Sequence, residues 1–256
     1  MTQTQRREWL IRYLLNERSE RINIPADEYG QRRLLRSLFN IRMPQQTSEE
    51  FLQIQDAYLQ EETARKGVID LADLKSVKKG IYLWQGDITA LLCDAIVNAA
   101  NSQMLGCFSP CHGCIDNAIH TYAGVQLRAA CYEIMLEQGH EEPTGEAKIT
   151  PAYNLPSKYV LHTVGPIVSG RLRESHCGLL KSCYLSCLKL AEENGVKSIA
   201  FCCISTGVFG FPQREAAEIA VHTVKEYKNT TNSDIKVIFN VFKDEDLQIY
   251  RRLLHP

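Results

Sequence analysis

Apolar residues in the first part of the chain recur every three or four positions, as they do on one face of a helix. The spacing is clearest over residues 9–14 and repeats over residues 34–39 and 51–59. No stretch before residue 80 alternates between apolar and polar positions as a half-buried strand does. The pattern predicts a helical extension over residues 1–79, and we expect it to pack on the remainder of the chain rather than form an independent binding module.

From residue 80 to residue 256, short apolar runs alternate with longer helical patterns. Strands separated by helices predict a largely parallel sheet with helices on both faces, which makes this second part an α/β domain. Ligands of such sheets usually bind at the carboxyl ends of the strands. The expected strands are 81–85, 95–99, 147–151, 159–163, 199–204 and 236–241, and the expected helices are 115–123, 125–137, 176–194, 213–228 and 244–254.

The amino-acid composition and the net charge limit the kinds of partner that the chain is expected to bind. The chain has 256 residues, of which 45% are hydrophobic and 23% charged, and its formal net charge is −1. This lack of basic excess argues against nucleic acid as a partner, and no basic amphipathic face points to a membrane. Charges run through the first 17 residues, so we expect neither a signal peptide nor a membrane span, and we expect a cytoplasmic protein.

Two strand ends carry side chains that suit a nucleotide ligand. Asp87 follows the first expected strand and could accept a hydrogen bond from a base or a ribose, although an ordinary helix-capping Asp is the alternative. Asn98 and Asn101 flank two alanines at the end of the second strand, and their amides suit a sugar diol. A turn closed by two Asn residues is the alternative there.

A glycine-containing loop lies between the expected strand 199–204 and the helix that begins at residue 213. Gly207 and Gly210 allow backbone N–H groups to turn toward one point, and the helix N-terminus adds partial positive charge. Together these features favour a phosphate or diphosphate. The loop is not the glycine pattern of nucleoside-triphosphate enzymes, and a simple turn is the alternative.

The ten cysteines include a cluster that differs from the rest. Cys107, His112 and Cys114 offer three zinc ligands within eight residues, in the pattern Cys-x4-His-x-Cys. Three protein ligands and an open position are typical of catalytic zinc, which polarises a substrate oxygen or lowers the pKa of a bound water toward ~7. A structural zinc closed by Cys111, and reduced thiols without metal, are the alternatives. Asp116 follows near a helix start and could orient a water or a ribose hydroxyl, or simply cap the helix.

These motifs, taken in order, resemble the macrodomain family from about residue 80 to the end. The resemblance implies a three-layer α/β/α fold that binds ADP-ribose. It implies that adenine lies near Asp87, Ile88 and Phe242, the distal ribose near Asn101, and the diphosphate against residues 205–209. The residues expected to contact ADP-ribose are Asp87, Ile88, Asn98, Asn101, Cys114, Ile115, Asp116, Asn117, Ser205, Thr206, Gly207, Val208, Phe209 and Phe242.

The loop before Asp116 departs from the glycine run that hydrolytic macrodomains usually carry. It resembles instead the zinc-containing branch of the family, and this implies zinc on Cys107, His112 and Cys114, with Cys111 as a bystander. Members of that branch look like ADP-ribosyl hydrolases linked to a sirtuin-type ADP-ribosyltransferase. Their implied substrate is an ADP-ribosylated lipoyl carrier protein of the glycine-cleavage type.

We therefore expect a zinc-dependent hydrolase that removes mono-ADP-ribose from protein side chains. Asn101, Asp116 and the three zinc ligands Cys107, His112 and Cys114 are the expected catalytic residues. The alternatives are a non-catalytic ADP-ribose reader with structural zinc, and an enzyme that deacetylates O-acetyl-ADP-ribose or dephosphorylates ADP-ribose-1″-phosphate.

Overall fold

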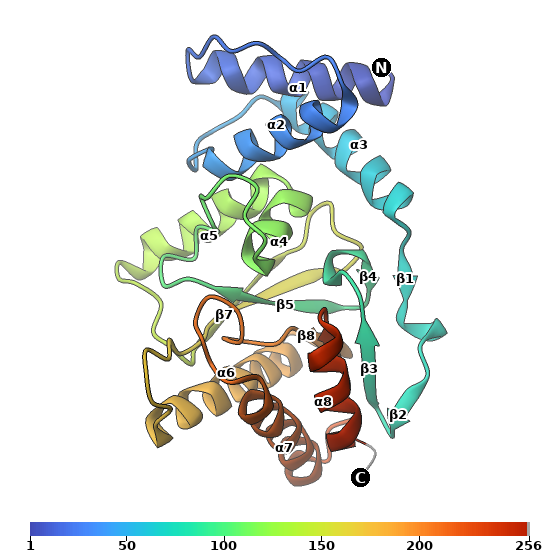
Figure 1. Ribbon diagram of the computed structural model, residues 1–256, viewed down its shortest axis with the longest axis vertical. Helices are drawn as coiled ribbons and strands as arrows, with labels where there is room; N and C mark the ends of the chain where they lie inside the picture. The colour runs from blue at the N-terminus through green and yellow to red at the C-terminus, as the bar shows by residue number, and fades with distance from the viewer. Residues whose placement is uncertain (255–256) are drawn as a thin grey trace.

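The computed structural model describes residues 1–254, and its N-terminal part is a layer of three helices (Figure 1). Thr2, Asp27 and Ser48 precede these helices, and each side chain accepts a hydrogen bond from an N–H of the first turn. The helices share a small hydrophobic core of their own, to which each contributes buried side chains. They are α1 (Gln3–Glu17), α2 (Glu28–Ile41) and α3 (Glu49–Lys66).

The rest of the described chain is built on a seven-stranded sheet with the order β2-β3-β9-β8-β5-β7-β6. The five central strands, from β3 to β7, run parallel, and the edge strands β2 and β6 are antiparallel to their neighbours. Two further strands, β1 and β4, pair with each other. The strands are β1 (Ile69–Asp70), β2 (Ser76–Lys78), β3 (Ile81–Gln85), β4 (Leu91–Leu92), β5 (Ala95–Ala100), β6 (Ala147–Pro151), β7 (Tyr159–Val164), β8 (Ser198–Phe201) and β9 (Lys236–Val241).

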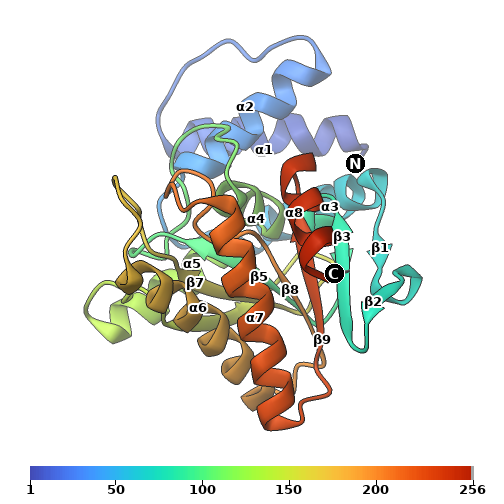
Figure 2. The same ribbon diagram turned by 60° about the horizontal axis from the view of Figure 1, so that its bottom comes forward.

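Helices cover both faces of this sheet and so complete three layers (Figures 1 and 2). One face carries α4 (Ile115–Ala123) and α5 (Val125–Gln138), and the three-helix layer packs on α4 from outside. The opposite face carries α6 (Glu174–Glu193), α7 (Gln213–Thr231) and α8 (Asp244–Leu254), which contact one another in that order. The expected three-layer α/β/α fold is confirmed.

The prediction that residues 1–79 are helical throughout is wrong at its end. Helix α3 stops at Gly67, whose φ is +89°, and the chain then forms β1, a 3-10 turn at Leu71–Asp73 and β2. These strands have two and three residues, too few to show an alternating pattern. They form because β4 and β3 offer backbone partners. The division of the chain at residues 79 and 80 stays a prediction.

Strand β8 is shorter than expected, because it ends at Phe201 rather than at Ile204. The following residues turn sharply, since the Ile204 N–H donates to the Cys202 carbonyl and the Thr206 N–H to the Cys203 carbonyl. The sharp turn brings Ser205 to the strand end. Within residues 1–254, no helix combines the length and the apolar character needed to cross a lipid bilayer.

Candidate functional site

The four strands β3, β9, β8 and β5 are parallel neighbours, so the loops that follow them lie at one edge of the sheet. Asp87 follows β3, Phe242 follows β9, Ser205 follows β8 and Asn101 follows β5. Motifs far apart in the sequence are therefore gathered at the carboxyl ends of the strands, where open α/β sheets bind ligands.

The loop after β8 presents unpaired backbone donors. Within the described chain, the N–H groups of Gly207, Val208 and Phe209 donate no hydrogen bond. Ser205 has a φ of +65°, an uncommon value for a residue with a side chain, and its buried hydroxyl lacks a partner. Three successive free N–H groups next to the N-terminus of α7 suit a phosphate group.

Asp87 lies at the other end of this edge, and its carboxylate is held on two sides. It accepts hydrogen bonds from the Thr89 N–H at 2.9 Å and from the Lys66 ammonium, at the end of α3, at 2.7 Å. Burial alone would raise the pKa of Asp87, but the bonds from Lys66 and Thr89 outweigh it and lower that pKa. The adjacent Ile88 is buried, whereas Phe242 is 76% exposed, and the stacking of Phe242 on adenine stays a prediction.

Cys107, His112 and Cys114 come together between β5 and α4. Their ligand atoms all lie within 4.8 Å of one another, and Cys107 Sγ is 3.6 Å from His112 Nδ1. Cys114 is also the N-cap of α4, since its sulfur accepts the Asn117 N–H at 3.4 Å. Two thiols and an imidazole at this spacing fit a zinc ion. Burial raises the pKa of the Cys114 thiol to about 12.

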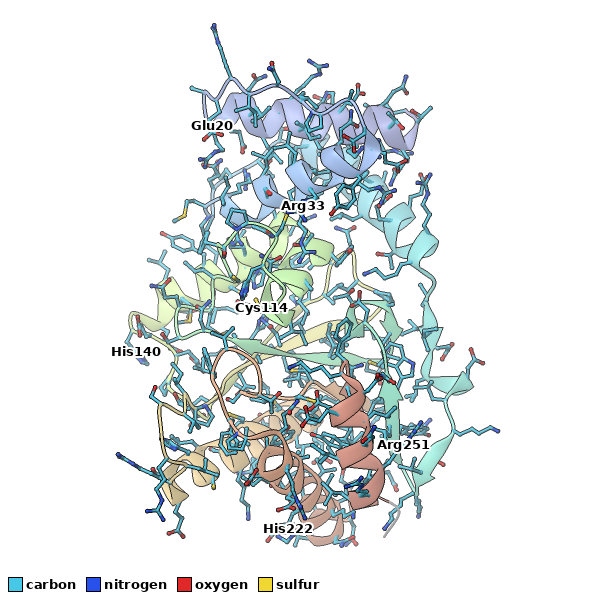
Figure 3. All side chains as sticks on the ribbon, in the orientation of Figure 1. Glu20, Arg33, Cys114, His140, His222 and Arg251 are labelled. Carbon is cyan, nitrogen blue, oxygen red and sulfur yellow. The ribbon has the colours of Figure 1, made fainter. Side chains whose placement is uncertain are left out.

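Cys111 points away from this group. Its sulfur is 3.3 Å from the Ser37 hydroxyl and from the Arg33 carbonyl oxygen, both on α2, and its φ is +53°. Figure 3 labels Arg33 on α2 and, below it, Cys114. The metal-capable group of this loop therefore contains Cys107, His112 and Cys114 and not Cys111.

The carboxylate of Asp116 lies one residue beyond Ile115, which opens α4, and is almost fully buried. Asn98 Nδ2 donates to its Oδ1 at 2.8 Å, and Asn101 Nδ2 lies 3.4 Å from its Oδ2. Burial raises the pKa of Asp116 to about 6. The structure thus brings Asp116 and Asn101 together as expected, but Asn98 is completely buried and faces Asp116, so a direct ligand contact of Asn98 stays a prediction.

Behind Asp116 lies a buried group that the sequence did not single out. His162 of β7 is 3.1 Å from Asn98 Nδ2 through Nδ1 and 2.9 Å from Thr150 Oγ1 through Nε2. Burial lowers the pKa of His162 to about 3, so the ring is neutral and orients the Asn98 amide. His120 and Cys131 lie beside it within 4.8 Å. A His inside the apolar run of β7 was the one available signal.

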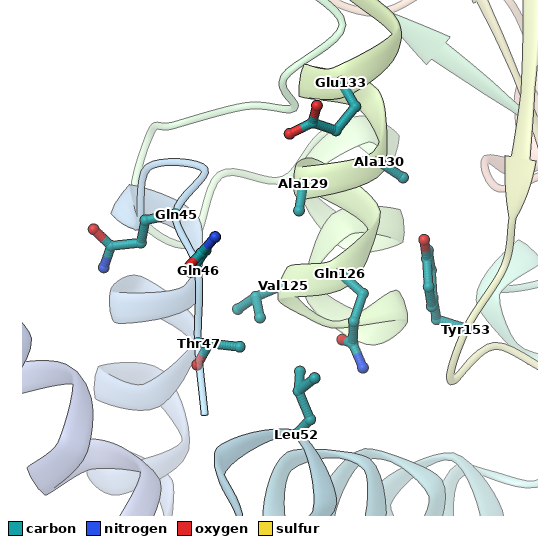
Figure 4. A pocket seen from close by; sticks show the side chains of 10 residues that line it. All are labelled: Gln45, Gln46, Thr47, Leu52, Val125, Gln126, Ala129, Ala130, Glu133 and Tyr153. Atoms are coloured by element: carbon teal, nitrogen blue, oxygen red, sulfur yellow. The ribbon is translucent and has the colours of Figure 1, made fainter. Parts of the chain in front are cut away.

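A separate cavity lies between the helical layer and α5 (Figure 4). It has a volume of about 410 Å³, and its walls include Gln46, Leu52, Gln126 and Tyr153. None of the expected site residues lines it.

Three comparisons place this geometry among known proteins. The model of the family described as "Macro domain" matches residues 97–220. A curated relative from Treponema medium, named protein-ADP-ribose hydrolase, is 62% identical over 99% of this chain and 100% of its own length. A protein of the same name from Staphylococcus aureus (strain MRSA252) is 53% identical over 96% of this chain and 94% of its own.

Solved structures show the same architecture. The macrodomain of Trypanosoma brucei in complex with ADP-ribose is 31% identical and superposes with a TM-score of 0.67. The comparison covers 86% of this chain and 94% of the trypanosomal chain.

Proposed function

This chain belongs to the Macro domain family, and we propose that it is a protein-ADP-ribose hydrolase that removes mono-ADP-ribose from modified protein side chains. The observation that carries the proposal is the juxtaposition at the sheet edge of three free backbone N–H groups with the buried carboxylate of Asp116. The first suits the diphosphate of the ligand, and the second suits the chemistry at its distal ribose. The name of the full-length relatives and the ADP-ribose in the trypanosomal complex support the same assignment.

The ligand follows the strand ends in this proposal. The diphosphate lies against the backbone of residues 205–209, adenine lies toward Asp87, Ile88 and Phe242, and the distal ribose reaches Asn101. Anchoring the diphosphate turns the encounter of the ribose with the catalytic groups into an oriented, effectively unimolecular step.

The chain's own groups then act on the bond between ribose C1″ and the protein side chain. Asn98, whose amide lies against His162, donates to Oδ1 of Asp116, and this leaves Oδ2, near Asn101, to accept a hydrogen bond from water. In the hydrolysis, the oxygen of that water bonds to C1″ and the bond to the protein side chain breaks. Asp116 takes the proton that the water loses, and this proton then passes to the leaving group or to the solvent.

We propose zinc as the resident metal, held by Cys107, His112 and Cys114. Support comes from the thiol and imidazole donors and from their spacing. When bound, zinc would polarise a ribose oxygen or a water beside Asp116. We also propose the cytoplasm as the compartment, because a site built from two thiols needs reduced cysteines.

The modified protein that we propose is a lipoyl carrier protein of the glycine-cleavage type, ADP-ribosylated by a sirtuin-type transferase. The support for both partners is the resemblance of the Cys107–Cys114 loop to the zinc-containing branch. The test measures product release from three substrates: an ADP-ribosylated carrier protein, O-acetyl-ADP-ribose and ADP-ribose-1″-phosphate. Free ADP-ribose from the first is expected. Turnover of only the other two, or ADP-ribose binding without release, would contradict the proposal.

Substitution of Gly207 tests the place of the diphosphate. A Cβ added at Gly207 meets no atom within 4 Å, so Gly207→Val should leave the melting temperature unchanged. The same side chain would crowd a diphosphate at the free N–H groups, and overpacking of this kind costs about 1–3 kcal/mol, or roughly 5- to 150-fold in the dissociation constant of ADP-ribose. Calorimetric titration with ADP-ribose checks this, and native affinity would place the diphosphate elsewhere.

A further inference from the structure

Helix α2 of the N-terminal layer contacts the loop that carries the proposed metal ligands. The Arg36 guanidinium donates from Nη2 to the His112 carbonyl oxygen at 3.0 Å. The same guanidinium donates from Nε and Nη2 to Asn117 Oδ1 at 3.1 and 2.7 Å. The Arg36 side chain therefore binds the backbone of His112, a proposed ligand, and the side chain of Asn117, three positions after Cys114, another proposed ligand.

Asn117 passes this contact on to the rest of the loop. Its side chain is fully buried, and its Nδ2 donates to the Ser109 carbonyl oxygen at 3.0 Å and to that of Cys107 at 3.4 Å. The Asn117 N–H also donates to Cys114 Sγ. Arg36 and Asn117 thus form one hydrogen-bonded unit that touches all three residues of the metal-capable group.

Asn40, one turn further along α2, supports the middle of the loop. Its Oδ1 accepts the Cys111 N–H at 2.8 Å, and its Nδ2 donates to Thr121 Oγ1 of α4 at 3.0 Å. Asn40 is 1% exposed, so water cannot replace these bonds easily. Cys111 has a left-handed φ, and this backbone conformation costs free energy in a residue with a side chain. The hydrogen bond from the Cys111 N–H to Asn40 helps to hold Cys111 in this conformation.

We propose that Arg36 and Asn40 are positioning residues that hold Cys107, His112 and Cys114 in a preformed metal-binding arrangement. The N-terminal helical layer is then part of the functional site. Outer partners that orient metal ligands typically contribute 10–100-fold in metal affinity. The inference rests on the proposed function only for the identity of the metal.

The first readout needs neither metal nor substrate. In zinc-free protein, Arg36→Ala should speed amide hydrogen exchange of the peptide covering residues 105–114 by about tenfold, since the loop then opens more often. The peptide covering β9 should exchange as in the native chain. Arg33→Ala is the matched control, because Arg33 is an exposed arginine of the same helix whose guanidinium does not contact the loop. It should change neither peptide.

The second readout is the affinity for Zn²⁺, measured by competition with a chromophoric chelator. Arg36→Ala and Asn40→Ala should weaken it by about 10–100-fold. Arg36→Lys keeps the positive charge but not the planar arrangement of donors. Its Zn²⁺ affinity should therefore lie between those of the native chain and of Arg36→Ala. Replacing zinc with Co²⁺ adds a spectroscopic signature, since the thiolate-to-cobalt absorption should shift in Arg36→Ala and not in Arg33→Ala.

Native exchange, native Zn²⁺ affinity and an unshifted cobalt spectrum in Arg36→Ala would overturn the inference. If Arg36→Ala does not fold, Arg36→Lys decides by the same criteria. Neither readout uses an ADP-ribosylated substrate, so an inactive hydrolase would refute the proposed function without altering this result.

Discussion

Cys107→Ala is expected to lower the rate of ADP-ribose release by about 10³-fold or more while the chain stays folded. The substitution removes one of three thiol and imidazole donors whose ligand atoms lie within 4.8 Å of one another. A Lewis acid supplies several kcal/mol of charge stabilisation in hydrolysis, and each 1.36 kcal/mol is a factor of ten in rate. Cys107 is only partly buried, so its truncation leaves no large cavity.

The measurements are the rate of product release, the zinc content and the melting temperature of the purified protein. Cys111→Ala is the matched control, because Cys111 lies in the same loop but turns its sulfur to α2. It should keep its zinc and nearly all of its activity. A zinc-free Cys107→Ala protein with full activity would contradict the metal assignment.

Asp116→Asn is expected to reduce kcat by about 10²–10⁴-fold, the range that a positioned general base or acid contributes. The amide nearly matches the carboxylate in volume, but it cannot take a proton from water. The affinity for ADP-ribose should change only a few-fold, because the substitution alters neither the diphosphate loop nor Asp87.

Single-turnover kinetics and calorimetric titration separate the two effects. Asp234→Asn, at an exposed position before β9, is the control and should leave both quantities unchanged. An unchanged kcat in Asp116→Asn would move the catalytic role to another group.

Periodicity alone predicted most of the elements from residue 80 onward. The expected bounds of β3, β6, β9, α4 and α8 coincide with the observed ones, because long apolar runs and helical faces are local signals. Strands β1 and β2 were not predicted, because they form on backbone partners supplied by β4 and β3, and no local sequence pattern reveals such partners.

The candidate site residues could be predicted from the sequence where they lie close together in it. Cys107, His112 and Cys114 occupy one short loop, and residues 205–209 occupy another. The residues that hold these loops in place could not be predicted, because they come from distant segments of the chain. Arg36 reaches Asn117 across 81 positions and His162 reaches Asn98 across 64. Contacts over such separations are set by the packing of helices and strands.

The measurement that tests the central claim most directly is the release of free ADP-ribose from a mono-ADP-ribosylated protein, before and after treatment with a zinc chelator. We expect release by the native chain, loss of release on chelation, and recovery when zinc is restored, with the melting curve showing folded protein throughout. Tight ADP-ribose binding without release under any of these conditions would contradict the account and indicate a reader of ADP-ribose in place of a hydrolase.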